Sequence, residues 1–131
     1  MDTRMHAVLA LSSVPLFLGA LLSDWAYSSS HQIQWVNFAA WLMAGGLLIA
    51  GPVLLWAAID LLRSPATRHR RSVIYLSLLL ATVVVGFINA LVHAKDGWAA
   101  MPTGLILSAL VVVLAAMASV VGLAGPLRRT A

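Results

Sequence analysis

The chain has 131 residues, of which 62% are hydrophobic and 9% are charged, and its formal net charge is +4. A soluble domain of this length carries about a quarter charged residues, so the composition excludes a water-soluble globular protein and predicts an integral membrane protein. No cysteine is present, which excludes disulfides, thiolate metal sites and cysteine nucleophiles.

Four apolar segments follow one another along the chain, at about residues 5–22, 33–62, 73–94 and 103–124. We expect the first to be a membrane helix and not a signal peptide, because it lacks a clear cleavage site. Pro15 should kink this helix. The second is long for one span and contains Gly51 and Pro52, which predicts a tilt or bend. Short connections predict that residues 1–131 form one all-α domain, an up-down four-helix transmembrane bundle.

Basic residues indicate the orientation of this bundle. Only Lys95 lies in the connections at residues 23–32 and 95–102. The other seven lie at the two termini and between the second and third segments: Arg4, Arg63, Arg68, Arg70, Arg71, Arg128 and Arg129. The positive-inside rule therefore predicts that both termini are cytoplasmic. The positive charge is thus explained as an orientation signal and not as a nucleic-acid surface.

Two histidines are predicted to lie at the same outer boundary, because His31 precedes the second segment and His93 ends the third. Asn89 and Gly86 share the helix face of His93, and its polar groups predict that this face points into the bundle. Gly45 lies deeper on the second helix. Axial imidazoles from two helices, with small residues beside the ring, are what a porphyrin requires. We therefore predict that His31 and His93 are the metal ligands of one b-type haem.

Further side chains could complete this cofactor site. Trp35 and Trp41 could form a wall around a flat cofactor or quinone ring, or could belong to an interfacial aromatic belt. Lys95 and backbone amides near Gly97 could meet the haem propionates at the water boundary. Met101 is the alternative partner of His93 if His31 is not a ligand.

Several other interpretations remain open. The histidines could simply bond to loop backbone, or could form a metal site with Asp24 or Asp96. His6 and His69 could form a second pair on the cytoplasmic side. Asp60 is expected to pair with a nearby arginine. No nucleotide-binding loop, nucleophile elbow or metalloprotease helix is present.

Two stretches carry a resemblance to a known family. They are residues 89–104, which begin Asn89-Ala-Leu-Val-His93, and residues 31–41, which begin His31-Gln-Ile-Gln-Trp35. Together they resemble a bacterial family of small four-helix predicted membrane proteins, classed as a domain of unknown function. The resemblance implies a location in the bacterial inner membrane. Because such proteins often accompany sugar dehydrogenases of the sorbosone or quinoprotein type, it also implies a periplasmic dehydrogenase as a partner.

The leading functional hypothesis is a b-type cytochrome subunit that passes electrons from a periplasmic dehydrogenase to quinone. It would be an electron-transfer subunit and not a stand-alone catalyst. The expected partners are the lipid bilayer, the dehydrogenase and quinone, with a homodimer as a further option and no nucleic acid. The alternatives are a cofactor-free anchor or assembly subunit and a small-solute channel or transporter. The lack of charged residues near the membrane midplane argues against a transporter.

Overall fold

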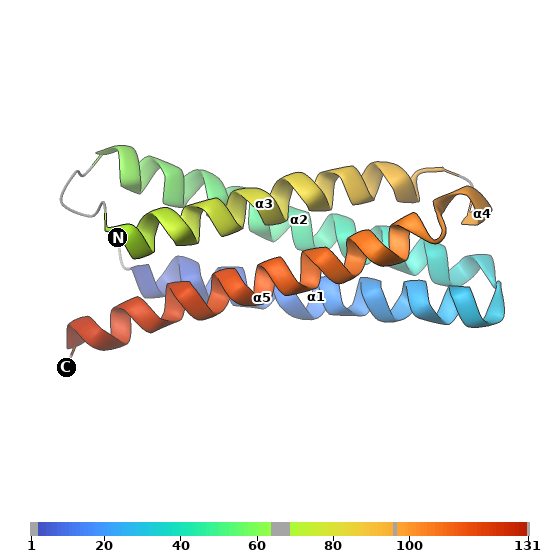
Figure 1. Cartoon of the computed structure of the whole chain (residues 1–131), viewed down its shortest axis with the longest axis horizontal. Coiled ribbons are helices and arrows are strands. Elements are labelled where there is room, and N and C mark those ends of the chain that lie inside the picture. The colour runs from blue at the N-terminus through green and yellow to red at the C-terminus, as the bar shows by residue number, and fades with distance from the viewer. Residues whose placement is uncertain (1–2, 64–68, 96, 131) are drawn as a thin grey trace.

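The computed structural model describes residues 3–63, 69–95 and 97–130. These residues form the helices α1 (Thr3–Ser30), α2 (Ile33–Arg63), α3 (Arg70–His93), α4 (Gly97–Ala100) and α5 (Thr103–Thr130). The four long helices are long and apolar enough to cross a membrane, and they lie side by side, with α4 as a short cap at one end (Figure 1). The prediction of an all-α four-helix membrane protein is confirmed.

The long helices form a bundle in which neighbours along the chain run in opposite directions (Figure 1). Helix α1 packs against α2 and α5, and α3 packs against the same two helices, so α1 and α3 lie on a diagonal. The start of α1, the end of α2, the start of α3 and the end of α5 lie at one end, here called the basic end because Arg63, Arg70 and Arg71 lie there. The α1–α2 turn and α4 lie at the other end, here called the α4 end.

Helix α1 is longer than the sequence predicted, because it continues to Ser30 through a stretch expected to be an outer loop. The serine hydroxyls of its last turn donate to carbonyls within the helix: Ser28 to Trp25 at 2.8 Å and Ser30 to Ala26 at 2.7 Å. These bonds satisfy the serine hydroxyls within the helix itself. His31 then adopts a left-handed φ of 61° and ends the helix. As a result, Asp24 lies inside the bundle and not in a loop.

Helices α1 and α2 both continue through their prolines. Pro15 and Pro52 are exposed on the outside of the bundle. A proline ring on that face removes one backbone hydrogen bond without interrupting the packing between helices.

Glycines bring the helices close together in the core. A side chain at Gly46 would overlap the ring of Phe17, and a Cβ at Gly86 would lie 2.8 Å from Leu47 Cδ2. Large apolar side chains such as Trp41, which is 79% exposed, face outward. Small residues at helix contacts and large ones outside are typical of membrane bundles, whose outer surface is covered by lipid.

Candidate functional site

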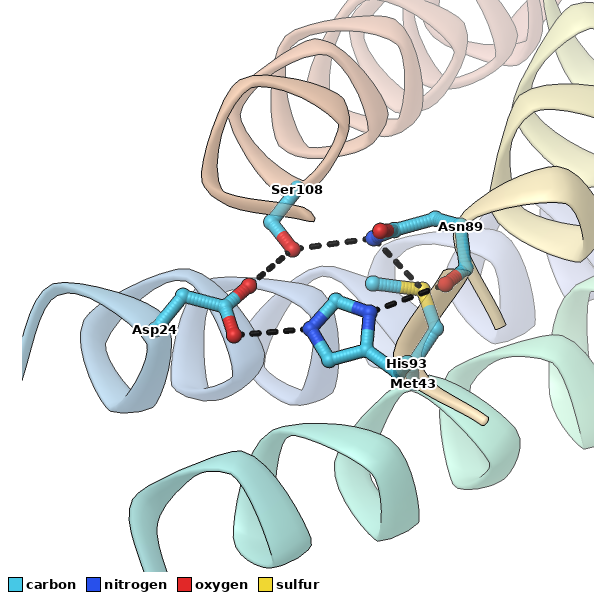
Figure 2. Close-up of polar contacts among 5 residues, drawn as sticks. All are labelled: Asp24, Met43, Asn89, His93 and Ser108. Carbon is cyan, nitrogen blue, oxygen red and sulfur yellow. Dashed lines mark hydrogen bonds and ion pairs between the residues drawn. The ribbon is translucent and has the colours of Figure 1, made fainter. Parts of the chain in front are cut away.

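The four long helices meet at the α4 end around a closed set of hydrogen bonds (Figure 2). His93 Nε2 lies 2.7 Å from Asp24 Oδ1, and His93 Nδ1 lies 2.8 Å from the backbone oxygen of Asn89. The side-chain amide of Asn89 donates to Ser108 Oγ at 2.9 Å, and Ser108 donates to Asp24 Oδ2 at 2.5 Å. The contacts therefore form a ring through Asp24, Ser108, Asn89 and His93, here called the polar centre.

Every member of the polar centre is buried. Asp24, Asn89 and Ser108 are 0% exposed, and His93 is 5% exposed. Met43 completes the surroundings from α2, with its sulfur 3.8 Å from Asn89 Nδ2. Buried ionisable groups are costly unless they are paired and hydrogen-bonded, and the polar centre meets both conditions for Asp24 and His93.

The positions of the protons follow from the chemistry of the partners. A backbone carbonyl only accepts, so His93 Nδ1 carries a proton and donates to Asn89. Ser108 accepts from the Asn89 amide, so its own proton points to Asp24. One proton then remains between His93 Nε2 and Asp24 Oδ1. With that shared proton the pair has no net charge, whether it is written as imidazolium and carboxylate or as imidazole and carboxylic acid.

Helical spacing places these side chains. Asn89 and His93 are four residues apart on α3, so they share the face that turns inward. Gly104 and Ser108 are likewise four residues apart on α5, and both are buried. Asp24 reaches the centre from α1 because that helix continues to Ser30, through most of the segment expected to be a loop.

One acceptor of the polar centre has no partner within the described part of the chain. Asn89 Oδ1 is buried and accepts no hydrogen bond there. The amide nitrogen of the same side chain contacts both Ser108 and Met43. Asn89 therefore contributes a donor to the network, while its oxygen carries an unmet hydrogen-bonding demand.

The structure separates the two histidines that the sequence paired. The prediction that Asn89, Gly86 and His93 face the bundle interior is confirmed by their burial. His31 lies at the same end of the bundle but is exposed in the α1–α2 turn, where its ring centroid is 6.1 Å from that of Tyr27.

The other predicted cofactor contacts lie outside the polar centre. Trp41 faces outward, and the exposed Trp35 packs edge-on against Phe38 at a centroid distance of 5.7 Å. Lys95 is exposed after the end of α3, and Met101 is partly buried. A Cβ at Gly45 would approach only Leu16 of α1.

Three remaining candidates are placed as follows. His69 is the exposed N-cap residue of α3 at the basic end. Asp96 lies outside the described residues, as does the side chain of His6. The second-haem and Asp96 hypotheses therefore stay predictions.

The residues present do not fit a haem held by His31 and His93. Axial ligation uses the lone pair of one imidazole nitrogen, and both ring nitrogens of His93 are hydrogen-bonded within the polar centre. The space beside Gly86 is filled by Leu47 and Met43.

Sequence reasoning missed two members of the polar centre in their present roles. The sequence suggests Asp24 only as a metal ligand from a loop, whereas it lies directly after the first apolar segment and belongs to the same helix. Ser108 carried a visible signal, because it is the only hydroxyl in the apolar stretch from Gly104 to Met117. A lone polar residue in such a stretch indicates a helix contact or a site.

Comparison with known proteins identifies the family. Residues 3–125 match the family described as predicted membrane protein DUF2231. No curated protein and no solved structure matches the chain. Because the match covers nearly the whole sequence, this chain belongs to the DUF2231 family of predicted membrane proteins.

Proposed function

We propose that this protein is a proton-linked membrane switch, in which the Asp24–His93 pair exchanges a proton with one aqueous side and thereby alters helix packing. The observation that carries the proposal is the buried 2.7 Å contact between Asp24 and His93, which joins two helices on a diagonal of the bundle. An ionisable residue within a membrane bundle is by default a candidate functional group.

Charge balance supports a switch that responds to a single proton. With one shared proton the pair is neutral, which suits a site shielded from water. Losing that proton leaves a buried negative charge, with a nitrogen lone pair facing the carboxylate. Gaining another leaves a buried positive charge. Among the described residues, Ser108 and Gly104 of α5 contact the pair, and Met43 of α2 contacts the adjacent Asn89. None of these groups is charged, so neither change is compensated locally, and the contact between α1 and α3 weakens in both cases.

The position of the polar centre supports exchange with one side only. Asn89 lies four residues from the end of α3, a depth of about 6 Å along the helix. Deeper in the bundle, the hydroxyls of Ser13, Thr82 and Ser119 each donate to a carbonyl of their own helix. These hydroxyls do not extend the polar centre toward the basic end. This arrangement favours a switch over a pathway that carries protons across the membrane.

Asp24→Asn tests the proposal with little change of shape. The introduced amide can donate to His93 Nε2 and accept from Ser108, so every hydrogen bond is kept while the shared proton is lost. Above about pH 6.5, a carboxylate and an imidazole in water carry no titratable proton. The hydrogen-bonded pair in the folded wild type carries one, between His93 Nε2 and Asp24 Oδ1. Wild-type stability should therefore fall with rising pH, by up to about 1.4 kcal/mol per pH unit.

Asp24→Asn should reverse this dependence. Its folded state holds a neutral His93, so stability should be flat above about pH 6.5 and fall below it, where a solvated histidine becomes protonated. Thermal unfolding in detergent, followed by circular dichroism between pH 5 and pH 9, measures both profiles. Asp60→Asn, at a partly buried position near the basic end of α2, is the matched control and should keep the wild-type profile. Identical profiles for wild type and Asp24→Asn would refute the switch.

The haem hypothesis and the switch make opposite demands on His93. Iron takes a ring nitrogen, whereas the polar centre uses both. A reduced-minus-oxidised absorption spectrum of the purified protein separates the two. A low-spin haem spectrum that is lost in both His31→Ala and His93→Ala would refute the switch and support electron transfer. It would also support the predicted roles of a dehydrogenase and quinone.

A further inference from the structure

Gly104 of α5 lies in close contact with the ring of His93 at the polar centre. A Cβ built at Gly104 would lie 3.0 Å from His93 Cε1, 3.3 Å from Nε2 and 3.6 Å from Nδ1. All three nearest atoms therefore belong to one imidazole. Carbon atoms in contact normally lie about 3.5–4.0 Å apart, so any side chain at this position must displace the ring.

The ring of His93 has little freedom to move. Its two nitrogens are held from opposite sides, by the backbone oxygen of Asn89 at 2.8 Å and by Asp24 at 2.7 Å. A displacement of a few tenths of an ångström would take the Asp24 contact toward the upper limit for a hydrogen bond. The absence of a side chain at Gly104 is thus what permits both bonds at once.

Helix α5 contacts the pair at two points one turn apart. Ser108 donates to Asp24, and Gly104 lies against His93. We infer that Gly104 and Ser108 together set the distance between Asp24 and His93, and that Gly104 is the positioning residue for the imidazole. This inference deepens the proposed switch, because it makes the placement of α5 the structural variable that proton loss or gain would change.

A thermodynamic cycle tests the role of Gly104 without relying on proton exchange. Gly104→Ala is measured in the wild type and in an Asp24→Asn, His93→Ala background, which lacks the ring and leaves no buried charge. We expect a clear loss of thermal stability in the wild type and about half that loss or less in the background. If Gly104→Ala does not fold alone, its recovery in the background supports the same conclusion.

Gly122→Ala is the matched control, because its Cβ would lie 2.6 Å from Tyr75 Cε1 near the basic end. It should cost the same in both backgrounds. Equal costs for Gly104→Ala in both backgrounds would overturn the inference, since they would show that Gly104 serves only backbone packing.

The pH profile provides a readout that a merely structural glycine would not move. Gly104→Ala should weaken the fall of stability above pH 6.5, while Gly122→Ala should leave it unchanged. A wild type without any such fall would refute the switch but leave the Gly104 cycle to stand on its own result.

Discussion

At the scale of single residues, Asn89 connects His93 of α3 with Ser108 of α5 in the polar centre. Its backbone oxygen holds His93, and its side-chain amide holds Ser108. The two contacts respond differently to mutation, because a substitution removes the side chain but keeps the carbonyl. Asn89 therefore allows the stability of the network to be separated from the position of the histidine.

Asn89→Leu should lower stability by about 1–2 kcal/mol through the loss of the bond to Ser108, a cost reduced because the unpartnered Oδ1 is removed as well. The fall of stability above pH 6.5 should persist, because Asp24 and His93 keep their own contacts. Thermal unfolding across the pH range checks both expectations. Asn37→Leu, at an exposed position of α2, should change neither. A lost pH dependence in Asn89→Leu would show that the amide takes part in holding the proton.

At the scale of helices, close packing depends on which face a glycine occupies. Gly46 of α2 lies against the buried ring of Phe17. Around the position where a Cβ of Gly51 would be, the described part of the chain has nothing within 4 Å apart from the adjacent backbone of α2 itself. The same residue type on the same helix therefore has different consequences five residues apart. The difference comes from the neighbouring helix α1 and not from local propensity.

Gly46→Ala should lower stability by about 1–3 kcal/mol, because the core around Phe17 becomes overpacked. Phe17→Leu should recover part of that loss in the double variant. Gly51→Ala should be neutral or stabilise by up to about 1 kcal/mol, as expected for glycine replaced in an open helical position. Denaturation of the four variants in detergent measures these differences. Equal costs at Gly46 and Gly51 would contradict the packing described here.

At the scale of the whole molecule, the basic residues and the polar centre lie at opposite ends of the bundle. The basic end carries Arg63, Arg70 and Arg71, and the polar centre lies near the α4 end. The positive-inside rule predicts that the basic end faces the cytoplasm. The switch would then exchange its proton with the opposite side of the membrane.

Single cysteines test this orientation cleanly, because the native chain contains none. A cysteine at the exposed Ser29 near the α4 end should react with an impermeant thiol reagent in intact cells. A cysteine at the exposed His69 should react only after the membrane is permeabilised. The reverse pattern would place both termini outside and the polar centre on the cytoplasmic side.

The sequence by itself determined the class of this protein and most of its architecture. Its apolar segments fix four membrane helices because backbone polar groups in lipid must bond within their own segment. The spacing of Asn89 and His93 placed both on one inward face, since four residues make about one helical turn. These conclusions depend only on local periodicity and on the energetics of burial.

Only the tertiary structure decided which groups meet at the polar centre. The partner of His93 is Asp24, which lies 69 residues away along the chain, and periodicity carries no information about which helix lies across a diagonal. His31 has the same residue type and lies at the same end of the bundle, yet its place in the left-handed turn after Ser30 leaves it exposed. The haem ligation by His31 and His93 that the sequence suggested stays a prediction. In the structure the buried imidazole of His93 pairs with a carboxylate, because a buried ionisable group needs a partner that can neutralise it.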